Sequence, residues 1–519
     1  MVTCRMVDKL IVTNRSALRK KYGTRGLAKI SAAVHALIAA DRKRDLITRL
    51  IALDSAAMKR YGAPVSDASS ARQNKRAIDA LYRALRPHYL LILGSIDVIP
   101  HQDPKNPMFA DDHEDDPVAW GDLPYACDAA YSRDITRFIG PTRVIGRLPD
   151  MTGARAPSHL LALLKTAATH QQRPLAQYLD YFALSAAVWK KSSQLSLANI
   201  FGNARKLLLA PPTGGTIVRR KLSPRSHFIN CHGALADPSF YGEDRKSMPL
   251  ALDSNDVRGR IRDGTVAAVE CCYGAELYDS IALRLPSPIC QSYLAHGAYG
   301  YFGSTTIAYG PLQGNGAADL ITQYFLLEVQ AGQSIGLAAL KAQQRYVQQV
   351  NELDPIDLKT LAQFYLLGDP SVQPVKVDSP TRTPPAGTRG VAKRSVRAAR
   401  RANTKRIGDL LRETKPTASH PTAPTRSPSV RRQLREIAKQ IGASPAASFT
   451  AFAVECAGRL DGRKRAPRRA AETSDTADKY HLLVTTADHL AKADVGSRVA
   501  VVARETSQRI VAYRVYYQR

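Results

Sequence analysis

The chain has 519 residues, which is too long for one ordinary domain and predicts several folding units. Apolar residues make up 44% of the sequence, so a sizeable core can form, and plentiful helix formers and β-branched residues favour an α/β protein over an all-β one. Lys and Arg outnumber Asp and Glu by 74 to 45, which predicts attraction to polyanions wherever the positive charge is concentrated.

The cysteines and the apolar segments bear on the compartment of the protein. Seven cysteines are an odd number in a long chain, which argues against a disulfide framework. The first residues lack the apolar core of a secretory signal, and no segment reaches the roughly 20 apolar residues of a membrane helix. We therefore expect a cytoplasmic protein with reduced thiols and no membrane span.

Residues 1–178 predict an N-terminal helical segment followed by a first α/β subdomain. Apolar residues recur at helical spacing up to about residue 87. The apolar run Tyr89–Leu93, closed by Gly94, is typical of a buried strand that ends in a turn. An acidic loop follows at residues 111–116, and the segment TRVIGRLPD then predicts another strand.

Residues 179–377 predict a second α/β block. Its segments YFALSAA, SHFINCHG, TVAAVECCYG and AYGYFGST are short apolar runs that end at glycine or polar residues, with helical stretches between them. This alternation predicts a mainly parallel sheet flanked by helices. In such sheets functional groups gather beyond the carboxyl ends of the strands, which is where His232 and Cys272 stand.

The remainder of the chain divides into a linker and a small domain. Residues 378–430 are rich in Pro, Arg, Lys, Ser and Thr and have very few aromatics, so they predict a basic disordered linker. Such a linker would contact polyanions through charge alone, without sequence preference. Residues 431–519 regain a helix pattern and strand patterns, which predicts a small C-terminal α+β domain.

Two of the predicted strand ends carry residues that could perform chemistry together. One strand ends in the sequence INCHG and the next in VECCYG. A nucleophilic thiol needs a base beside it and backbone N–H groups aimed at the developing oxyanion. His232 can act as the base for the thiol of Cys272, and its imidazole should lower the pKa of that thiol. Gly233 would let the main chain approach a substrate closely.

At these residues the sequence resembles the caspase-like clan of cysteine peptidases. In that clan His-Gly ends one strand, and an acidic or Gln residue, a small residue and Cys end the next. The segments LLILGSIDVIP, DLPYACDAAY, VIGRLPD and LGDPSV make the chain similar to the gingipain type over about residues 88–375. The resemblance implies a caspase-like fold of two α/β subdomains, with the catalytic one at residues 179–377.

The resemblance also implies a function. It is that of a cysteine-type endopeptidase that hydrolyses peptide bonds of protein or peptide substrates through a thioester intermediate. The catalytic residues would be His232 and Cys272, and the backbone N–H groups of Gly233 and Cys272 would bind the oxyanion. No cofactor or metal is required for this chemistry.

The gingipain type also has a Glu that supports the His and, a little further on, an Asp that binds substrate arginine. The matching stretch here is SAAVWKKSSQLS, with Ala187 in place of the acid. Lys190 and Lys191 stand where a carboxylate would be needed for a guanidinium. The sequence therefore does not identify a third catalytic residue. It also predicts that the residue preferred before the scissile bond is not restricted to arginine.

Other roles for these residues remain open. Cys271 is the alternative nucleophile, because some members of the clan have Gly three positions after the Cys, as Gly274 is here. Cys231, His232, Cys271 and Cys272 could instead bind zinc, although adjacent ligands chelate poorly. Calcium could bind the acidic loop, although a solvated loop is the simpler interpretation. That loop contains Asp111, Asp112, Glu114, Asp115 and Asp116.

Two alternatives to a peptidase follow from the same sequence. A catalytically inactive binding protein on the caspase-like fold is conceivable, because the expected supporting acid is missing from its usual place. A polyanion-binding protein would rest on the basic linker, but that segment lacks the aromatic residues that stacking on nucleic-acid bases requires. Cys231, Cys290, Cys456 and His296 are interpreted as structural.

Overall fold

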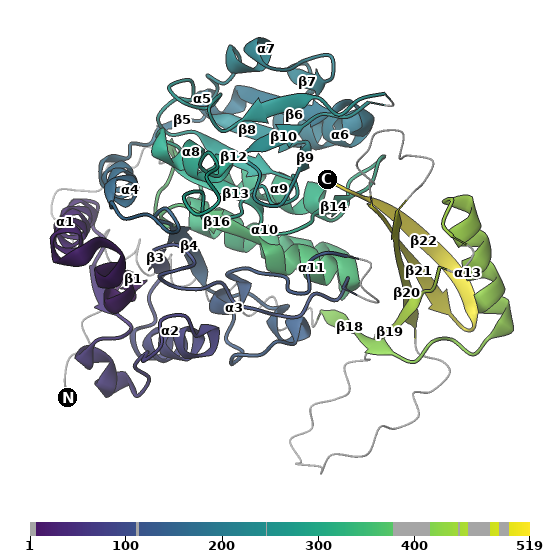
Figure 1. Cartoon of the computed structure of the whole chain (residues 1–519), viewed down its shortest axis with the longest axis horizontal. Helices are drawn as coiled ribbons and strands as arrows, with labels where there is room; N and C mark the ends of the chain where they lie inside the picture. The colour runs from purple at the N-terminus through teal and green to yellow at the C-terminus, as the bar shows by residue number, and fades with distance from the viewer. Residues whose placement is uncertain are drawn as a thin grey trace, which may run out of the picture.

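The computed structural model describes residues 7–109, 114–244, 246–376, 416–444, 447–454, 478–486 and 498–519. A large sheet with helices on its faces dominates the molecule, and a second sheet lies at one end (Figure 1). The mixed α/β fold with a mainly parallel sheet, predicted from the sequence, is confirmed.

The large sheet has ten strands in the order β2-β1-β3-β4-β16-β13-β12-β8-β6-β7. Their bounds are β1 Lys9–Thr13, β2 Thr48–Ala52, β3 Tyr89–Leu93, β4 Val144–Leu148, β6 Tyr181–Ala186, β7 Leu207–Ala210, β8 Ser226–Asn230, β12 Val266–Val269, β13 Gly300–Ser304 and β16 Phe364–Leu367. The pairs are parallel except β13 with β16, so the strands of the two halves run in opposite directions within one continuous sheet.

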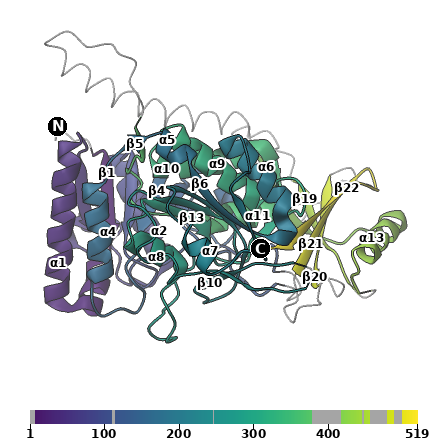
Figure 2. The same ribbon diagram turned by 90° about the horizontal axis from the view of Figure 1, so that it is seen from above.

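Helices cover the large sheet because its strands are apolar on both sides, and α13 packs on the second sheet instead. The helices are α1 Arg15–Lys43, α2 Ala71–Leu85, α3 Leu123–Ala126, α4 Ser158–Thr169, α5 Ala176–Leu179, α6 Lys190–Phe201, α7 Thr216–Arg219, α8 Ile289–Ala295, α9 Ala318–Gln330, α10 Ile335–Val350, α11 Pro355–Gln363 and α13 Pro428–Gln440. Figure 2 shows α1 and α4 packed side by side at one end of the molecule and α13 at the opposite end. No helix in the described ranges has the length and apolar character needed to cross a bilayer.

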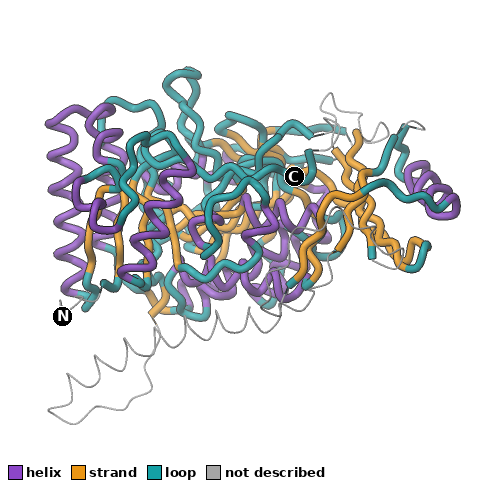
Figure 3. The backbone as a smooth tube through the Cα atoms, turned by 90° about the horizontal axis from the view of Figure 1, so that it is seen from below, coloured by secondary structure: helices purple, strands orange, loops and turns teal. Residues whose placement is uncertain are grey.

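The second sheet joins the C-terminal part of the chain to the block that contains His232 and Cys272. Its seven strands are ordered β14-β22-β21-β20-β19-β18-β15. Their bounds are β14 Tyr309–Gly310, β15 Glu352–Leu353, β18 Thr417–Thr422, β19 Thr450–Val454, β20 Lys479–Thr486, β21 Arg498–Thr506 and β22 Arg509–Gln518. Figure 3 shows these strands between α13 and the large sheet. The C-terminal part is therefore fastened by backbone pairing of β22 with β14 and of β18 with β15.

The structure differs from the predicted linker at its C-terminal end. Residues 416–430 belong to the segment that the composition predicted to be disordered, yet Thr417–Thr422 form strand β18 and α13 begins at Pro428. The physical reason is that β15 and β19 flank this strand and satisfy its backbone groups whatever its side chains are. The prediction for residues 378–415 lies outside the described residues.

Two small sheets complete the fold. One pairs β5 Arg173–Pro174 with β17 Val375–Lys376. The other is formed by β9 His232–Gly233, β10 Ser239–Tyr241 and β11 Leu250–Asp253, and it extends from the end of β8. In the hairpin of β9 and β10, His232 lies opposite Tyr241 and Gly233 lies opposite Phe240.

Candidate active site

The structure brings the segments of His232 and Cys272 together. β8 and β12 are adjacent parallel strands, with Ile229 opposite Val269, so the residues that follow them leave the sheet at the same edge. A Cβ atom added to Gly233 would lie 1.9 Å from the carbonyl oxygen of Cys272. The two turns therefore pack so closely that only glycine fits at position 233.

Glu243 orients the imidazole of His232. The Nε2 atom of His232 donates to a carboxylate oxygen of Glu243 at 2.6 Å, and the imidazole ring packs on Trp189 with ring centroids 4.4 Å apart. The main chain of Glu243 is fixed as well, because its N–H donates to Ala210 and its carbonyl accepts from Val188. This acid thus contacts the stretch in which the resemblance implied one, but it belongs to a different segment.

Sequence reasoning missed Glu243, although a local signal was present. The hairpin of β9 and β10 places Tyr241 opposite His232, and Glu243 follows two residues after Tyr241. A glutamate shortly after a hairpin partner of the candidate base could have been examined as its support. The family pattern places the acid elsewhere, at the position of Ala187.

The two adjacent thiols lie in different surroundings. Cys271 is buried and its Sγ accepts a hydrogen bond from the N–H of Cys231 at 3.3 Å. Cys272 is also buried, and its Sγ accepts from the N–H of Ala308 at 3.2 Å. The two side chains enter separate apolar clusters, as expected for consecutive residues at the end of a strand.

Burial dominates the acidity of both thiols. Burial raises the pKa of Cys272 to about 12, against the hydrogen bonds from the main chain of Ala308 and Arg519, which lower it. Burial also raises the pKa of Cys271 well above its ordinary value. The prediction that the imidazole lowers the thiol pKa is therefore wrong for this structure, in which desolvation outweighs every nearby charge. Within the described residues, no hydrogen bond joins His232 to either thiol.

Arg519 covers Cys272. The N–H of Cys272 donates to the carbonyl oxygen of Arg519 at 3.3 Å, and the N–H of Arg519 donates to the carbonyl of Ala308 at 2.9 Å. Figure 1 places this end of the chain beside β9 and β14. The side chain is completely buried and stacks on Trp189, with the guanidinium carbon 4.5 Å from the ring centroid. Trp189 thus contacts both Arg519 and His232.

A buried carboxylate binds the guanidinium of Arg519. Its Nη2 atom donates to Asp319 Oδ1 at 2.9 Å, to the carbonyl of Pro311 at 3.0 Å and to Ser192 Oγ at 3.4 Å. Burial and the charge of Asp319 raise the pKa of the neighbouring Glu270 well above its ordinary value, and Arg519 opposes them. No local sequence pattern indicates this contact, because Asp319 and Arg519 are 200 residues apart.

The sequence predicts that Lys190 and Lys191 lie in the region where a substrate guanidinium would bind. Neither lysine takes part in the contact between Arg519 and Asp319. They begin α6 and are exposed, whereas Ser192, the next residue, faces Asp319 and donates to it at 2.7 Å. Asp319, in the first turn of α9, is a carboxylate that binds the guanidinium of Arg519. The expectation that substrate preference is not restricted to arginine stays a prediction.

A cavity of about 500 Å³ is lined in part by residues that follow Cys272 in the chain. Its lining includes Tyr273 and Glu276 from that segment, and the partly exposed apolar side chains of Trp120 and Leu235. Burial raises the pKa of Glu276 to about 7, although the N–H of Ala236 hydrogen-bonds the carboxylate and lowers it. The cavity has the size and apolar character of a ligand site.

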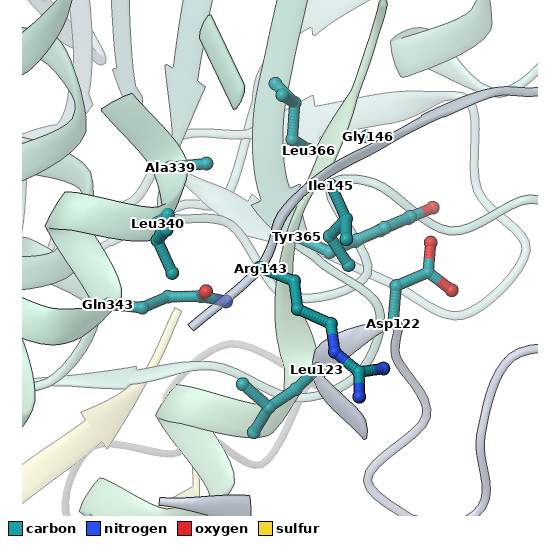
Figure 4. A pocket seen from close by; sticks show the side chains of 10 residues that line it. All are labelled: Asp122, Leu123, Arg143, Ile145, Gly146, Ala339, Leu340, Gln343, Tyr365 and Leu366. Atoms are coloured by element: carbon teal, nitrogen blue, oxygen red, sulfur yellow. The ribbon is translucent and has the colours of Figure 1, made fainter. Parts of the chain in front are cut away.

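A second pocket lies between β4, β16 and α10 and is much smaller. Figure 4 shows Asp122 and Arg143 on one side of it and Leu340 and Gln343 of α10 on the other. Its volume is about 10 Å³, which is room for one water molecule at most. It contains none of the residues that the sequence singled out.

The described carboxylates of the acidic loop form ion pairs and hydrogen bonds with the surrounding protein. Glu114 pairs with the buried Lys359, and Asp115 forms two hydrogen bonds of 2.5 Å with Arg498. Asp116 accepts from the hydroxyl of Tyr273 and from the N–H of Ile307, both at 3.0 Å. Asp111 and Asp112 lie outside the described residues.

The structure gives no support to the metal alternatives. Across the described ranges, no group of three or more His, Cys, Asp or Glu side chains is arranged to hold a metal ion, and this includes the zinc set around His232. The described carboxylates of the acidic loop are engaged by cations and N–H or O–H donors. That the chemistry needs no cofactor stays a prediction.

Comparisons with known proteins add little to this geometry. No protein-family model matches the chain, and no curated protein matches it in sequence. The chain is similar to a solved structure named "Structure of Protease", with 13% sequence identity over 99% of this chain and 97% of that chain, and a TM-score of 0.48. A likeness at this level assigns neither a family nor an activity.

Proposed function

We propose that this chain is a cysteine peptidase in which His232 and Cys272 act together, with Glu243 as the support of His232. The observation that carries the proposal is that the N–H of Cys272 donates to a backbone oxygen, that of Arg519, at 3.3 Å, while the imidazole of His232 on the neighbouring turn is held by a carboxylate. A carbonyl on that N–H stands where the oxyanion of an acyl-transfer reaction would form.

The arrangement supports a defined sequence of proton transfers. Glu243 engages Nε2 of His232, so Nδ1 is the nitrogen that can take a proton from the thiol. As the sulfur of Cys272 attacks the carbonyl carbon, its proton passes to His232, which gives it to the leaving amine when the C–N bond breaks. Water then attacks the thioester carbon and gives a proton to His232; the C–S bond breaks, the carboxylic acid product leaves, and His232 returns the proton to the sulfur.

The backbone has a part in this reaction. The N–H of Cys272 would bind the oxyanion, and the N–H of Gly233 is proposed as the second donor because the two turns are in contact. Burial raises the pKa of the Cys272 thiol to about 12, which favours proton transfer to His232 during attack over a preformed thiolate.

The cavity next to Tyr273 and Glu276 would hold the part of the substrate that leaves. The backbone of Arg519 contacts Cys272, and the next residue, Tyr273, lines the cavity. A peptide bound at Cys272 would extend from there into the cavity.

The test is cleavage of a peptide library by the natural chain and by the Arg519→Ala chain, because Arg519 covers Cys272. Each is compared with the same chain carrying Cys272→Ala. Cleavage by either chain that disappears with Cys272→Ala supports the proposal, as does a peptide-ester acyl group found on Cys272 by mass spectrometry. Absence of cleavage and of acylation in both chains would overturn it and favour the inactive binding protein.

A further inference from the structure

Helix α13 packs on the second sheet with its apolar face. Val430, Leu434 and Ile437 form one buried cluster with Leu483 of β20 and Val501 of β21. Figure 2 shows the helix on the outside of the molecule, beyond that sheet. An amphipathic helix that lies on a membrane needs a free apolar face to enter the lipid. Because this face of α13 is already covered, the helix offers its polar side to a partner.

The polar side of α13 is strongly basic. Arg431, Arg432, Arg435 and Lys439 are exposed, and Glu436 is the one acidic residue of the helix. Helix geometry places the four basic residues within an arc of about 100°, on the side away from the buried cluster. Three of them follow each other at intervals of four residues, which is a rise of about 6 Å at each step. They form a row along the axis of the helix.

The basic row works against the stability of its own helix. The first turn of α13 contains no acidic residue, so nothing there balances the positive end of the helix dipole, and Arg431 and Arg432 follow directly. Arg435 stands four residues from both Arg431 and Lys439, a spacing at which like charges repel. No described carboxylate forms an ion pair with any of the four basic residues. A bound polyanion would relieve this repulsion.

The chemistry of the row favours phosphate groups. Three of its four members are arginines, whose planar fork can donate two hydrogen bonds to one phosphate. Arg431 and Arg435 each donate one hydrogen bond to a main-chain carbonyl, which leaves the other N–H groups of both guanidinium groups for a ligand. A row of cations is matched by a ligand whose anions repeat along a line, as the phosphates of a nucleic acid strand do.

The neighbouring strand β22 adds an exposed aromatic ring. It runs beside α13, because the N–H of Ile510 donates to Gln433 at 3.0 Å and the hydroxyl of Tyr513 donates to Gln440 at 3.1 Å. The side chain of Tyr513 is 45% exposed. Proteins that bind unpaired nucleic acid combine a basic surface with aromatic rings on which the bases stack. Both features occur here on adjacent elements.

We propose that α13 binds the phosphate backbone of single-stranded nucleic acid through Arg431, Arg432, Arg435 and Lys439, and that Tyr513 stacks on one of the bases. The site belongs to the C-terminal part of the chain and does not depend on peptidase activity. Contacts with phosphates carry no information about sequence, so we expect little preference for one base sequence over another.

The experiment compares two variants of the full-length chain that lose the same charge from different faces. The test variant carries Arg431→Gln, Arg435→Gln and Lys439→Gln. The control variant carries Arg19→Gln, Arg25→Gln and Lys29→Gln. The control residues are exposed and belong to α1, which lies at the opposite end of the molecule from α13 (Figure 2). The probe is a fluorescent strand of about 20 thymidines, long enough to span such a site, and polarisation is measured over a series of salt concentrations.

We expect the test variant to bind the strand at least about tenfold more weakly than the natural chain at low salt. The slope of log affinity against log salt should become shallower by about 2, because three phosphate contacts are lost. The control variant should change the affinity less than about threefold. Equal weakening in both variants would show that net charge alone attracts the strand and would overturn the site. Unchanged binding by the test variant, or no binding by the natural chain, would also overturn it.

A second set of variants separates binding from folding and tests the aromatic ring. Thermal unfolding should show the test variant to be at least as stable as the natural chain, because the repulsion is removed. The single substitution Arg435→Glu should also weaken binding, and if it does not, the basic row is not the site. Tyr513→Leu should weaken binding of the single strand at least about fivefold and leave a duplex of the same length unaffected. An equal effect on both would overturn the stacking.

Vesicles test the other source of phosphate groups. Binding to vesicles of phosphatidylcholine and phosphatidylserine should be the same for the test variant and the control variant, because the apolar face of α13 is covered. If the test variant loses binding to the vesicles but keeps binding to the thymidine strand, the basic row recognises a lipid surface and the assignment to nucleic acid is overturned.

Discussion

The Nε2 atom of His232 donates a hydrogen bond of 2.6 Å to the carboxylate of Glu243. The relationship fixes which ring nitrogen faces the rest of the site, and it supplies the acid that was missing from the expected segment around Ala187. Glu243 reaches this place through the hairpin of β9 and β10 and through backbone contacts with Ala210 and Val188.

Glu243→Gln should lower kcat because the amide keeps the hydrogen-bonding shape but cannot stabilise the imidazolium that forms during attack. We expect a loss of about 10- to 100-fold in kcat with a smaller change in KM. The measurement is steady-state cleavage of a peptide substrate found with the library, across a pH series. Asp244→Asn is the control, since it removes a neighbouring exposed carboxylate that turns away into its own loop. An unchanged kcat would show that Glu243 has only a structural part.

Cys272→Ala and His232→Ala should each abolish most turnover, by at least about 10³-fold in kcat, and the double variant should be little worse because the two groups act as one unit. Cys271→Ala should keep substantial activity, at a stability cost of about 1 kcal/mol for a small buried side chain. Peptide cleavage and thermal unfolding measure the two effects. A dead Cys271→Ala chain beside an active Cys272→Ala chain would assign the nucleophile to the other sulfur.

Gly233→Ala should disrupt the site, because its Cβ atom would lie 1.9 Å from the carbonyl oxygen of Cys272. The two turns must move apart, which we expect to cost about 1–3 kcal/mol of stability and most of the activity. Gly140→Ala is the matched control, since a Cβ atom there meets nothing within 4 Å. If both variants unfold at the temperature of the natural chain and cleave equally well, the close approach of the turns is not needed.

Glu276 should make stability depend on pH. Burial raises its pKa from an ordinary 4.5 to about 7, so between these values the folded state holds a proton that the unfolded state has released. The contribution of this group to the free energy of unfolding is therefore fully present below pH 4.5 and is lost as the pH rises through 7. The total loss is about 3 kcal/mol at most. The Glu276→Gln chain should lose this decline, which thermal unfolding of both chains between pH 5 and 8 can measure. Parallel curves would contradict the shifted pKa.

The basic linker should bind nucleic acid through charge only. Its affinity for any oligonucleotide should fall steeply as salt is added and should not distinguish one sequence from another. Titration of two unrelated oligonucleotides at low and high salt tests this. Binding that persists at high salt, or that selects one sequence, would favour the alternative of a nucleic-acid-binding protein.

The sequence by itself determined the class of fold and the place of the candidate catalytic residues. Buried strands such as Tyr89–Leu93 and Val266–Val269 are short apolar runs ended by turns, and this pattern is local. Because β8 and β12 are neighbours in the large sheet and pair in parallel, the residues that follow them, His232 and Cys272 among them, leave the sheet at the same edge, as the sequence predicts. Local pattern and sheet geometry suffice for that much.

The tertiary structure alone decided what surrounds these residues. Asp319 meets Arg519 across 200 residues, and β18 is a strand because β15 and β19 flank it, so neither could be inferred from neighbouring sequence. The acidity of Cys272 was mispredicted for a related reason. Its pKa depends on how completely the fold removes water from the thiol, and burial is a property of all the packed elements together.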